Sequence, residues 1–161
     1  MKKTTYHSEL IFALNDRLFI SALEGVTDEQ AKERISDHNN PLIWIAAHTL
    51  FARYNTLSML GSTVQNPYGE QFANFRPYDP ADQFPSLDAI KTEWAKVASQ
   101  LKDAFAAVTE EHLAADCPLK SPIGDFSFAG TIAFLASHEC YDIGQMAFLK
   151  KYYTNSPMKY N

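Results

Sequence analysis

The sequence predicts an all-α protein, an antiparallel four-helix bundle with short connecting helices and one long loop between the second and third long helices. Apolar side chains recur every three or four residues in four long segments, which is the spacing of one helix face. Residues that cap or stop helices stand at the ends of these segments. A length of 161 residues suits one core, so we expect a single domain over residues 1–161.

The first long helix is expected over residues 6–23, with a stop signal at Gly25. Thr27 and Gln30 then form a capping-box pattern, in which each side chain satisfies a free amide of the first helical turn. This pattern predicts a short connecting helix that ends before Asp37. The inward face of the long helix is predicted to be Leu10, Ile11, Leu14, Leu18 and Ala22.

The second long helix is expected to begin at Asn40-Pro41, because Asn is a favoured N-cap and proline is tolerated at the first helical position. Gly61 ends this helix. Its predicted inward face includes one titratable side chain among apolar and amide residues: Leu42, Ile45, His48, Ala52, Asn55 and Met59.

The third and fourth long helices complete the predicted bundle. Ser86 caps the third helix, whose regular seam is Leu87, Ile90, Trp94, Val97, Leu101, Ala104 and Val108. The fourth helix is expected from about Ser127 to Tyr153. Its predicted inward face is Phe128, Ile132, Leu135, His138, Asp142, Gln145, Leu149 and Tyr152.

Residues 62–85 are predicted to form the long loop, because its prolines, Pro67, Pro77, Pro80 and Pro85, prevent a long helix. The loop is also rich in aromatic side chains: Tyr68, Phe72, Phe75, Tyr78 and Phe84. Two interpretations stay open at this point. The loop covers one end of the core, or it is a lid that faces a substrate.

Composition and charge exclude several functional classes. The formal net charge of −5 and the lack of a basic run disfavour nucleic acid as a partner. No segment approaches the roughly 20 apolar residues of a transmembrane helix, and no signal peptide is recognisable, so no membrane partner is expected. Cys117 and Cys140 form no C-x-x-C pair and suit a reducing compartment, so we expect a cytoplasmic protein.

His138 and Asp142 are four residues apart, so they lie one turn apart on one helix face. That face is otherwise apolar, and a buried unpaired carboxylate there is costly. His48 occupies the inward face of the second helix in the same way. Two imidazoles and a carboxylate can ligate zinc, nickel or ferrous iron, so the site hypothesis is a metal held by His48, His138 and Asp142.

The alternative is a structural cluster without metal. The same three side chains can hydrogen-bond one another or nearby polar residues, such as Tyr54, Asn55, Tyr141 and Gln145. No catalytic residue is assigned from the sequence. Cys140 lies on a different helix face and is expected to be a small apolar filler. Glu139 is expected to be solvated, or else to accept a hydrogen bond from a metal ligand or act as a general base.

Three segments together resemble the DinB-like superfamily of four-helix bundles. They are residues 40–48 (NPLIWIAAH), the Pro122-Ile123-Gly124 turn, and residues 138–145 (HECYDIGQ). Many members of that superfamily bind a divalent metal through three histidines, one on the second helix and two in an H-x-x-x-H on the fourth. His48 and His138 match the first two, whereas the third position is Asp142 here. This substitution leaves open whether metal is bound at all.

The resemblance also implies activities and partners. Characterised relatives include thiol S-transferases that use low-molecular-weight thiols such as bacillithiol, and a mycothiol-dependent isomerase. A metal-dependent transferase or hydrolase with a small thiol or an electrophilic substrate is therefore expected, as is a homodimer. The competing expectation is a non-catalytic helical protein that serves in binding or assembly.

Overall fold

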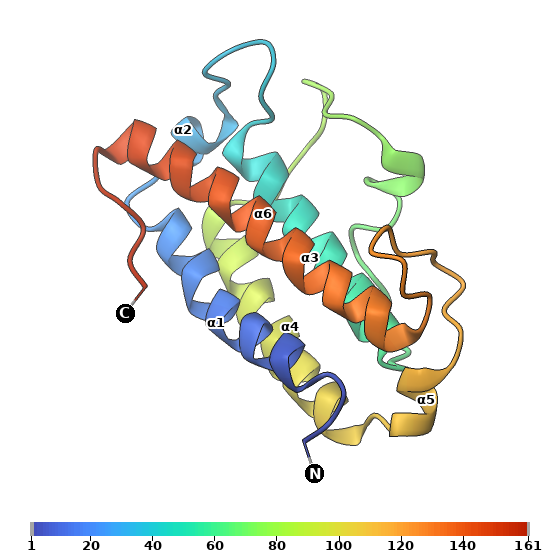
Figure 1. Ribbon diagram of the computed structural model, residues 1–161. Coiled ribbons are helices and arrows are strands. Elements are labelled where there is room, and N and C mark those ends of the chain that lie inside the picture. The colour runs from blue at the N-terminus through green and yellow to red at the C-terminus, as the bar shows by residue number, and fades with distance from the viewer. Residues whose placement is uncertain (1, 161) are drawn as a thin grey trace.

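The computed structural model describes residues 2–160. Four long helices lie side by side (Figure 1): α1 (Tyr6–Leu23), α3 (Leu42–Met59), α4 (Leu87–Ala107) and α6 (Phe128–Thr154). The shorter elements are α2 (Asp28–Lys32), α5 (Glu110–Ala114) and the 3-10 turn η1 (Ala73–Phe75). No strand occurs in residues 2–160, where an isolated bridge joins Asp116 to Ser127. The predicted all-α class is confirmed.

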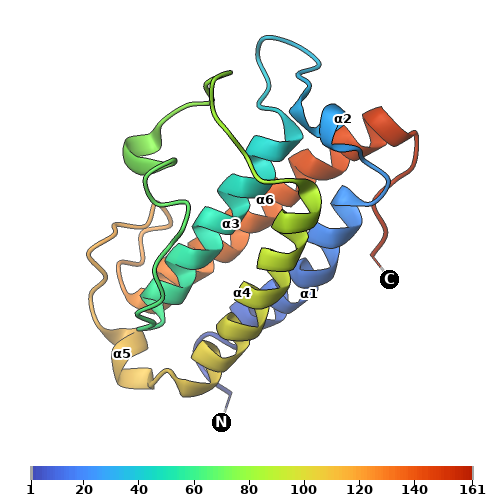
Figure 2. The same ribbon diagram turned by 180° about the vertical axis from the view of Figure 1, so that it is seen from behind.

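The directions of the long helices explain why one loop is long. Lys3, just before α1, donates from Nζ to the carbonyl oxygen of Phe105 near the end of α4, so α1 and α4 run in opposite directions. Asp28, the first residue of α2, accepts from the backbone N–H of Leu87, the first residue of α4. Because α2 also packs against α3, the helices α3 and α4 begin at the same end of the molecule and run in the same direction (Figure 2). The chain must therefore return along the molecule between them.

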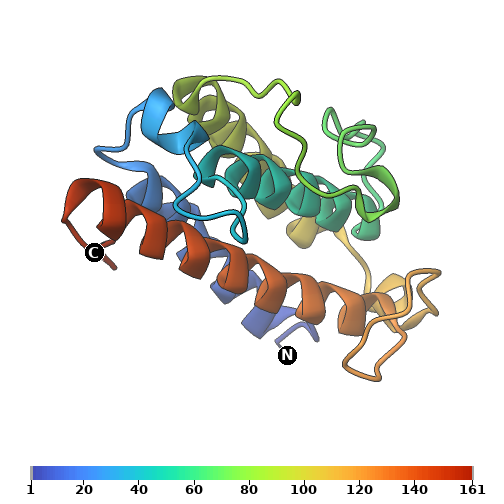
Figure 3. The ribbon, with the colours of Figure 1, turned by 90° about the horizontal axis from the view of Figure 1, so that it is seen from above.

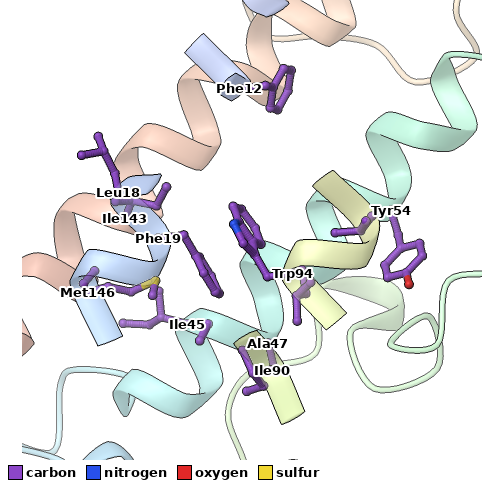
Figure 4. Close-up of a cluster of buried hydrophobic side chains, with 14 of the residues drawn as sticks. Phe12, Leu18, Phe19, Ile45, Ala47, Tyr54, Ile90, Trp94, Ile143 and Met146 are labelled. Atoms are coloured by element: carbon purple, nitrogen blue, oxygen red, sulfur yellow. The ribbon is translucent and has the colours of Figure 1, made fainter. Parts of the chain in front are cut away.

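The core is centred on two stacked aromatic rings, Phe19 of α1 and Trp94 of α4, whose centroids lie 3.8 Å apart (Figure 4). Side chains from α3 and α6, including Ile45 and Met146, surround this pair. The seam predicted on α4 is confirmed, because its residues from Leu87 to Val108 at three- and four-residue spacing are buried or half-buried. Burial of this apolar surface makes the largest favourable contribution to folding.

The predicted inward faces of α1 and α6 are wrong at three positions. Leu10 and Ile11 are 51% and 37% exposed, because Phe12 and the Phe19 ring set the rotation of α1 instead. Tyr152 on α6 is 62% exposed. In each case the helix carries apolar residues on more than one face, so spacing alone does not identify the buried one.

Two of the three predicted helix caps are confirmed. Ser86 accepts from the backbone N–H of Ala89, and the capping box of Thr27 and Gln30 is complete. Ser127, which was predicted only as the approximate start of the fourth helix, also caps it and accepts from the backbone N–H of Gly130. The predicted cap at Asn40 is wrong. Pro41 adopts an extended conformation with ψ 154°, so α3 begins one residue later, at Leu42, and has no side-chain cap.

The loop of residues 62–85 runs along the side of α3 that faces away from α1 (Figures 1 and 3). Tyr68 and Phe72 are buried and belong to the core, so this part of the loop covers α3. Residues 73–77 are exposed. Within residues 2–160, no helix combines the length and apolarity needed to cross a bilayer.

Candidate metal centre

Side chains from α3 and α6 meet at one polar cluster between these helices. The potential ligand atoms of His48, His138 and Asp142 all lie within 4.8 Å of one another. Asp142 Oδ2 is 3.3 Å from His138 Nδ1 and 4.0 Å from His48 Nε2. The structure thus brings together the three residues that the sequence selected, although His48 is far from the other two along the chain.

The carboxylate lies deeper than the imidazoles. The side chain of Asp142 is 5% exposed, whereas those of His48 and His138 are 23% and 29% exposed. Gln145, one turn further along α6, contacts Asp142 Oδ1 through a long hydrogen bond of 3.5 Å. The cluster therefore has a buried acidic floor and two half-exposed imidazoles above it.

Several polar atoms of this cluster have no hydrogen-bond partner among the described residues. These buried atoms are Nδ1 of His48, Nδ1 of His138 and Oδ2 of Asp142, of which the last two lie 3.3 Å apart without the alignment of a hydrogen bond. Leaving a buried polar atom unpaired costs about 1–3 kcal/mol. The alternative interpretation, a structural cluster without metal, named Tyr54 and Tyr141 as possible hydrogen-bond partners. Neither fills this role, because the Tyr54 hydroxyl donates to Glu93 and Tyr141 is 68% exposed. The contacts within residues 2–160 therefore leave the cluster's hydrogen-bonding capacity unfilled.

The donor set fits a divalent ion. Zinc binds imidazole nitrogen and carboxylate oxygen at about 2.0–2.2 Å, which places tetrahedral ligands about 3.4 Å apart. The separations of 3.3 and 4.0 Å from Asp142 Oδ2 to the two imidazoles are near this value, and all three potential ligand atoms lie within 4.8 Å of one another. Two histidines and one carboxylate also suit nickel or ferrous iron, so geometry does not choose among these metals.

The two imidazoles have different electrostatic surroundings. Burial lowers the pKa of His48, although the charge of Asp142 opposes this shift. The close polar contact with Asp142 raises the pKa of His138, and burial opposes that shift. The lowered pKa favours the neutral form of His48, which is the form that ligates metals, whereas the raised pKa of His138 favours its protonated form.

Arg53, which the sequence did not single out, lies at the centre of a buried ionic network beside the cluster. Its guanidinium donates to both carboxylate oxygens of Glu139, at 2.7 and 2.9 Å, and also to Asp16. The guanidinium carbon lies 3.6 Å from the ring centroid of Trp94. Contacts from Arg53 therefore tie α3 to α1, α4 and α6. The sequence did contain a sign that Arg53 is unusual, because it is the one charged residue in the segment that forms α3.

The expectation that Glu139 is solvated is wrong. Glu139 is 1% exposed and faces Arg53, not solvent and not the metal cluster. Burial raises the pKa of Glu139, and the neighbouring Arg53 guanidinium lowers it. Spacing alone does not reveal this partner, because Arg53 lies on a different helix. Glu139 is a structural ion-pair partner.

The remaining cysteine and histidines lie outside the cluster. Cys140 is exposed rather than an apolar filler, and its thiol contacts the Asn15 side-chain amide at 3.4 Å. His7 and His38 are exposed. His112 is half-buried instead, with Nε2 2.7 Å from the Met59 carbonyl oxygen.

A cavity of about 550 Å³ reaches His48 and His138. Aromatic rings line much of it. Trp44 stacks on His48 with centroids 5.0 Å apart, Phe72 meets the His48 ring edge-on at 5.2 Å, and Phe134 does the same to His138 at 5.9 Å. The cavity thus connects the two half-exposed imidazoles to an apolar chamber between α3, α6 and the long loop.

Comparison with known proteins identifies relatives of this chain. The family model described as the DinB superfamily matches residues 12–146. A crystal structure of a conserved protein from Enterococcus faecalis superimposes with a TM-score of 0.72 over 97% of this chain and 100% of that one, at 15% identity. At this identity the likeness shows the fold alone. No functionally curated protein matches the sequence.

Proposed function

The chain belongs to the DinB superfamily, and we propose that it is a divalent-metal-dependent enzyme whose metal is held by His48, His138 and Asp142. The observation that carries this proposal is the convergence of two imidazoles and one carboxylate from two helices, whose potential ligand atoms lie within 4.8 Å of one another. We further propose that the four long helices act as one bundle, in which α3 packs against the oppositely directed α6 and holds the ligands in place.

Each ligand has a distinct role in this proposal. His48 and His138 supply neutral nitrogen donors from opposite walls, and Asp142 supplies a negative charge from the floor. Gln145 contacts the second oxygen of Asp142 and restrains the carboxylate. When bound, the metal supplies Lewis-acid activation, which lowers the pKa of a thiol or water that coordinates it.

The cavity lining supports a nucleophile that comes from outside the chain. Among the described residues that line the cavity there is no Ser, Thr, Cys, Lys, Asp or Glu. Enzymes that attack the substrate with one of their own side chains usually use a residue of these types, activated by a neighbouring base. A thiol transferase or a hydrolase, in which a small thiol or water attacks, therefore fits this lining best.

The experiment that tests the proposal is elemental analysis of the untagged protein. We expect close to one zinc, nickel or iron per chain, and we expect the His48→Ala variant to lose it. His38→Ala is the matched control, because His38 is exposed and its side chain lies outside the cluster. Metal that is lost equally in both variants, or that never binds, would reject the metal centre and favour a non-catalytic binding protein.

Activity is then measured on the loaded protein. We expect transfer of a small thiol to an electrophilic dye, or hydrolysis of an activated ester, that is lost on chelation and in His48→Ala but kept in His38→Ala. Activity that persists in His48→Ala would show that the metal cluster is not the reaction centre.

A further inference from the structure

We propose that the cavity beside His48 and His138 binds a small uncharged molecule with an aromatic or other apolar body, which Phe75 covers. This inference names the substrate class for the proposed enzyme and in that sense rests on the proposed function. The binding step, however, depends only on the side chains of this chain, so it can be tested without metal.

The walls of the cavity favour a flat apolar ligand. Trp44 and Phe51 come from α3, Phe72 from the loop and Phe134 from α6. Phe72 is fixed, since it is 4% exposed and meets Trp44 edge-on at 5.3 Å. A volume of about 550 Å³ lies within the range of small-molecule sites, roughly 300–1,000 Å³. The rings therefore form a preformed chamber and need little rearrangement to receive a ligand.

The charges around the cavity argue against a ligand with an ionised body. Apart from the two histidines, Arg76 is the one charged residue among the described residues that line it. Its guanidinium is already paired, at 2.7 Å from Asp82 and 3.9 Å from Asp79. In the metal-free protein, a carboxylate in the chamber would lose its hydration without gaining a free cation, and an organic cation would find no lining carboxylate. Uncharged apolar ligands avoid both penalties.

Phe75 is placed to close over such a ligand. It lines the cavity, yet its side chain is 99% exposed. Both Phe75 and Asn74 have positive φ, at 57° and 56°, which is unusual and unfavourable for residues other than glycine. An apolar ligand would bury the Phe75 ring and offset that cost.

The test uses N-phenyl-1-naphthylamine, a neutral dye whose fluorescence rises in apolar surroundings, with EDTA-treated protein. We expect saturable binding of one dye per chain and about fivefold weaker binding by Phe75→Ala, because part of one phenyl contact is lost. Phe148→Ala is the matched control, since Phe148 is a 63% exposed ring on α6 outside this cavity. Both substitutions are at exposed side chains, so the fold should survive. Absent binding, or equal weakening in both variants, would overturn the proposal.

Displacement of the dye tests the charge preference. We expect 2-naphthylmethanol to displace it at least about tenfold more effectively than 2-naphthoate, which has the same rings and a carboxylate. Equal displacement, or preference for the anion, would overturn the proposal. Zinc content separates the two claims: dye binding by protein that takes up no zinc would reject only the metal enzyme, whereas zinc uptake without dye binding would reject only the ligand class.

Discussion

Single residues decide the chemistry of this molecule, and Asp142 is the clearest example. A third histidine would complete the donor set that is common in the superfamily, but this chain has a carboxylate that is 4% exposed. The sequence alone was sufficient to select His48, His138 and Asp142 because all three interrupt apolar helix faces. The spacing of residues along the chain does not give the distance between two helices. Only the structure therefore shows how the polar atoms of these three side chains lie relative to one another.

Arg53 and Glu139 show the opposite case. Both are charged, so their types predict exposure, yet the Arg53 side chain is 0% exposed and that of Glu139 is 1% exposed. Neither residue can be buried without the other, because an unpaired buried charge is costly. Such a pairing between helices leaves no mark in the local sequence of either one.

We predict that Arg53→Met destabilises the protein by about 3–5 kcal/mol, because it leaves the Glu139 carboxylate buried without its partner. The double variant Arg53→Met, Glu139→Met should regain most of this loss, since both charges are then absent. Urea denaturation of the three proteins measures both effects. A single variant that unfolds at the wild-type urea concentration would show that the network contributes little.

Helix ends and glycine positions determine how the elements form. The capping signals of α2 and α4 were correct because a capping side chain acts within three residues of the helix start. The start of α3 was wrong by one residue, since proline is compatible with either of two adjacent positions there. The rotation of α1 was also wrong, because its large aromatic side chains, and not its aliphatic ones, set the buried face.

Replacing each of two glycines in α6 by alanine should change the stability of the protein in opposite directions. A Cβ at Gly130 would lie 2.4 Å from Asp125 Cγ, so Gly130→Ala should push Asp125 away from Ser127 and destabilise the protein by about 1–3 kcal/mol. A Cβ at Gly144 meets nothing within 4 Å, so Gly144→Ala should stabilise the protein by about 0.5–1 kcal/mol. Urea unfolding midpoints report both changes. Shifts of the same sign would contradict the difference in packing between the two positions.

At the scale of the whole molecule, the directions of the helices determine where the cavity forms. Because α3 and α4 run in the same direction, the intervening loop must travel the length of α3, and it lies over the side of α3 that carries His48. The prolines predicted that residues 62–85 are not a long helix. They could not predict that the loop supplies one wall of the cavity, since this depends on the relative direction of two distant helices.

Limited proteolysis tests this placement of the loop. We predict that chymotrypsin cuts first after Phe75, which is 99% exposed, and that cutting after Tyr68 and Phe72 is slow because these rings are buried. Mass spectrometry of the first fragments identifies the site. The exposed ring of Phe148 serves as a control, because it lies within a helix and should resist cutting. Early cutting after Phe72 would show that the loop does not hold its position against α3.

The superfamily resemblance further predicts a homodimer. Size-exclusion chromatography with light scattering on the untagged protein should give twice the mass of the chain. A species of single-chain mass at all concentrations tested would contradict this expectation without affecting the metal centre, whose three ligands come from one chain.

Anomalous diffraction at the zinc absorption edge would show directly whether His48, His138 and Asp142 hold a divalent metal. The crystals would be grown from untagged protein with one equivalent of zinc. We expect one strong anomalous peak between α3 and α6, within bonding distance of both imidazoles and the Asp142 carboxylate. A map with no peak at this position, or with zinc bound only by exposed histidines such as His7 or His38, would contradict the proposed metal centre.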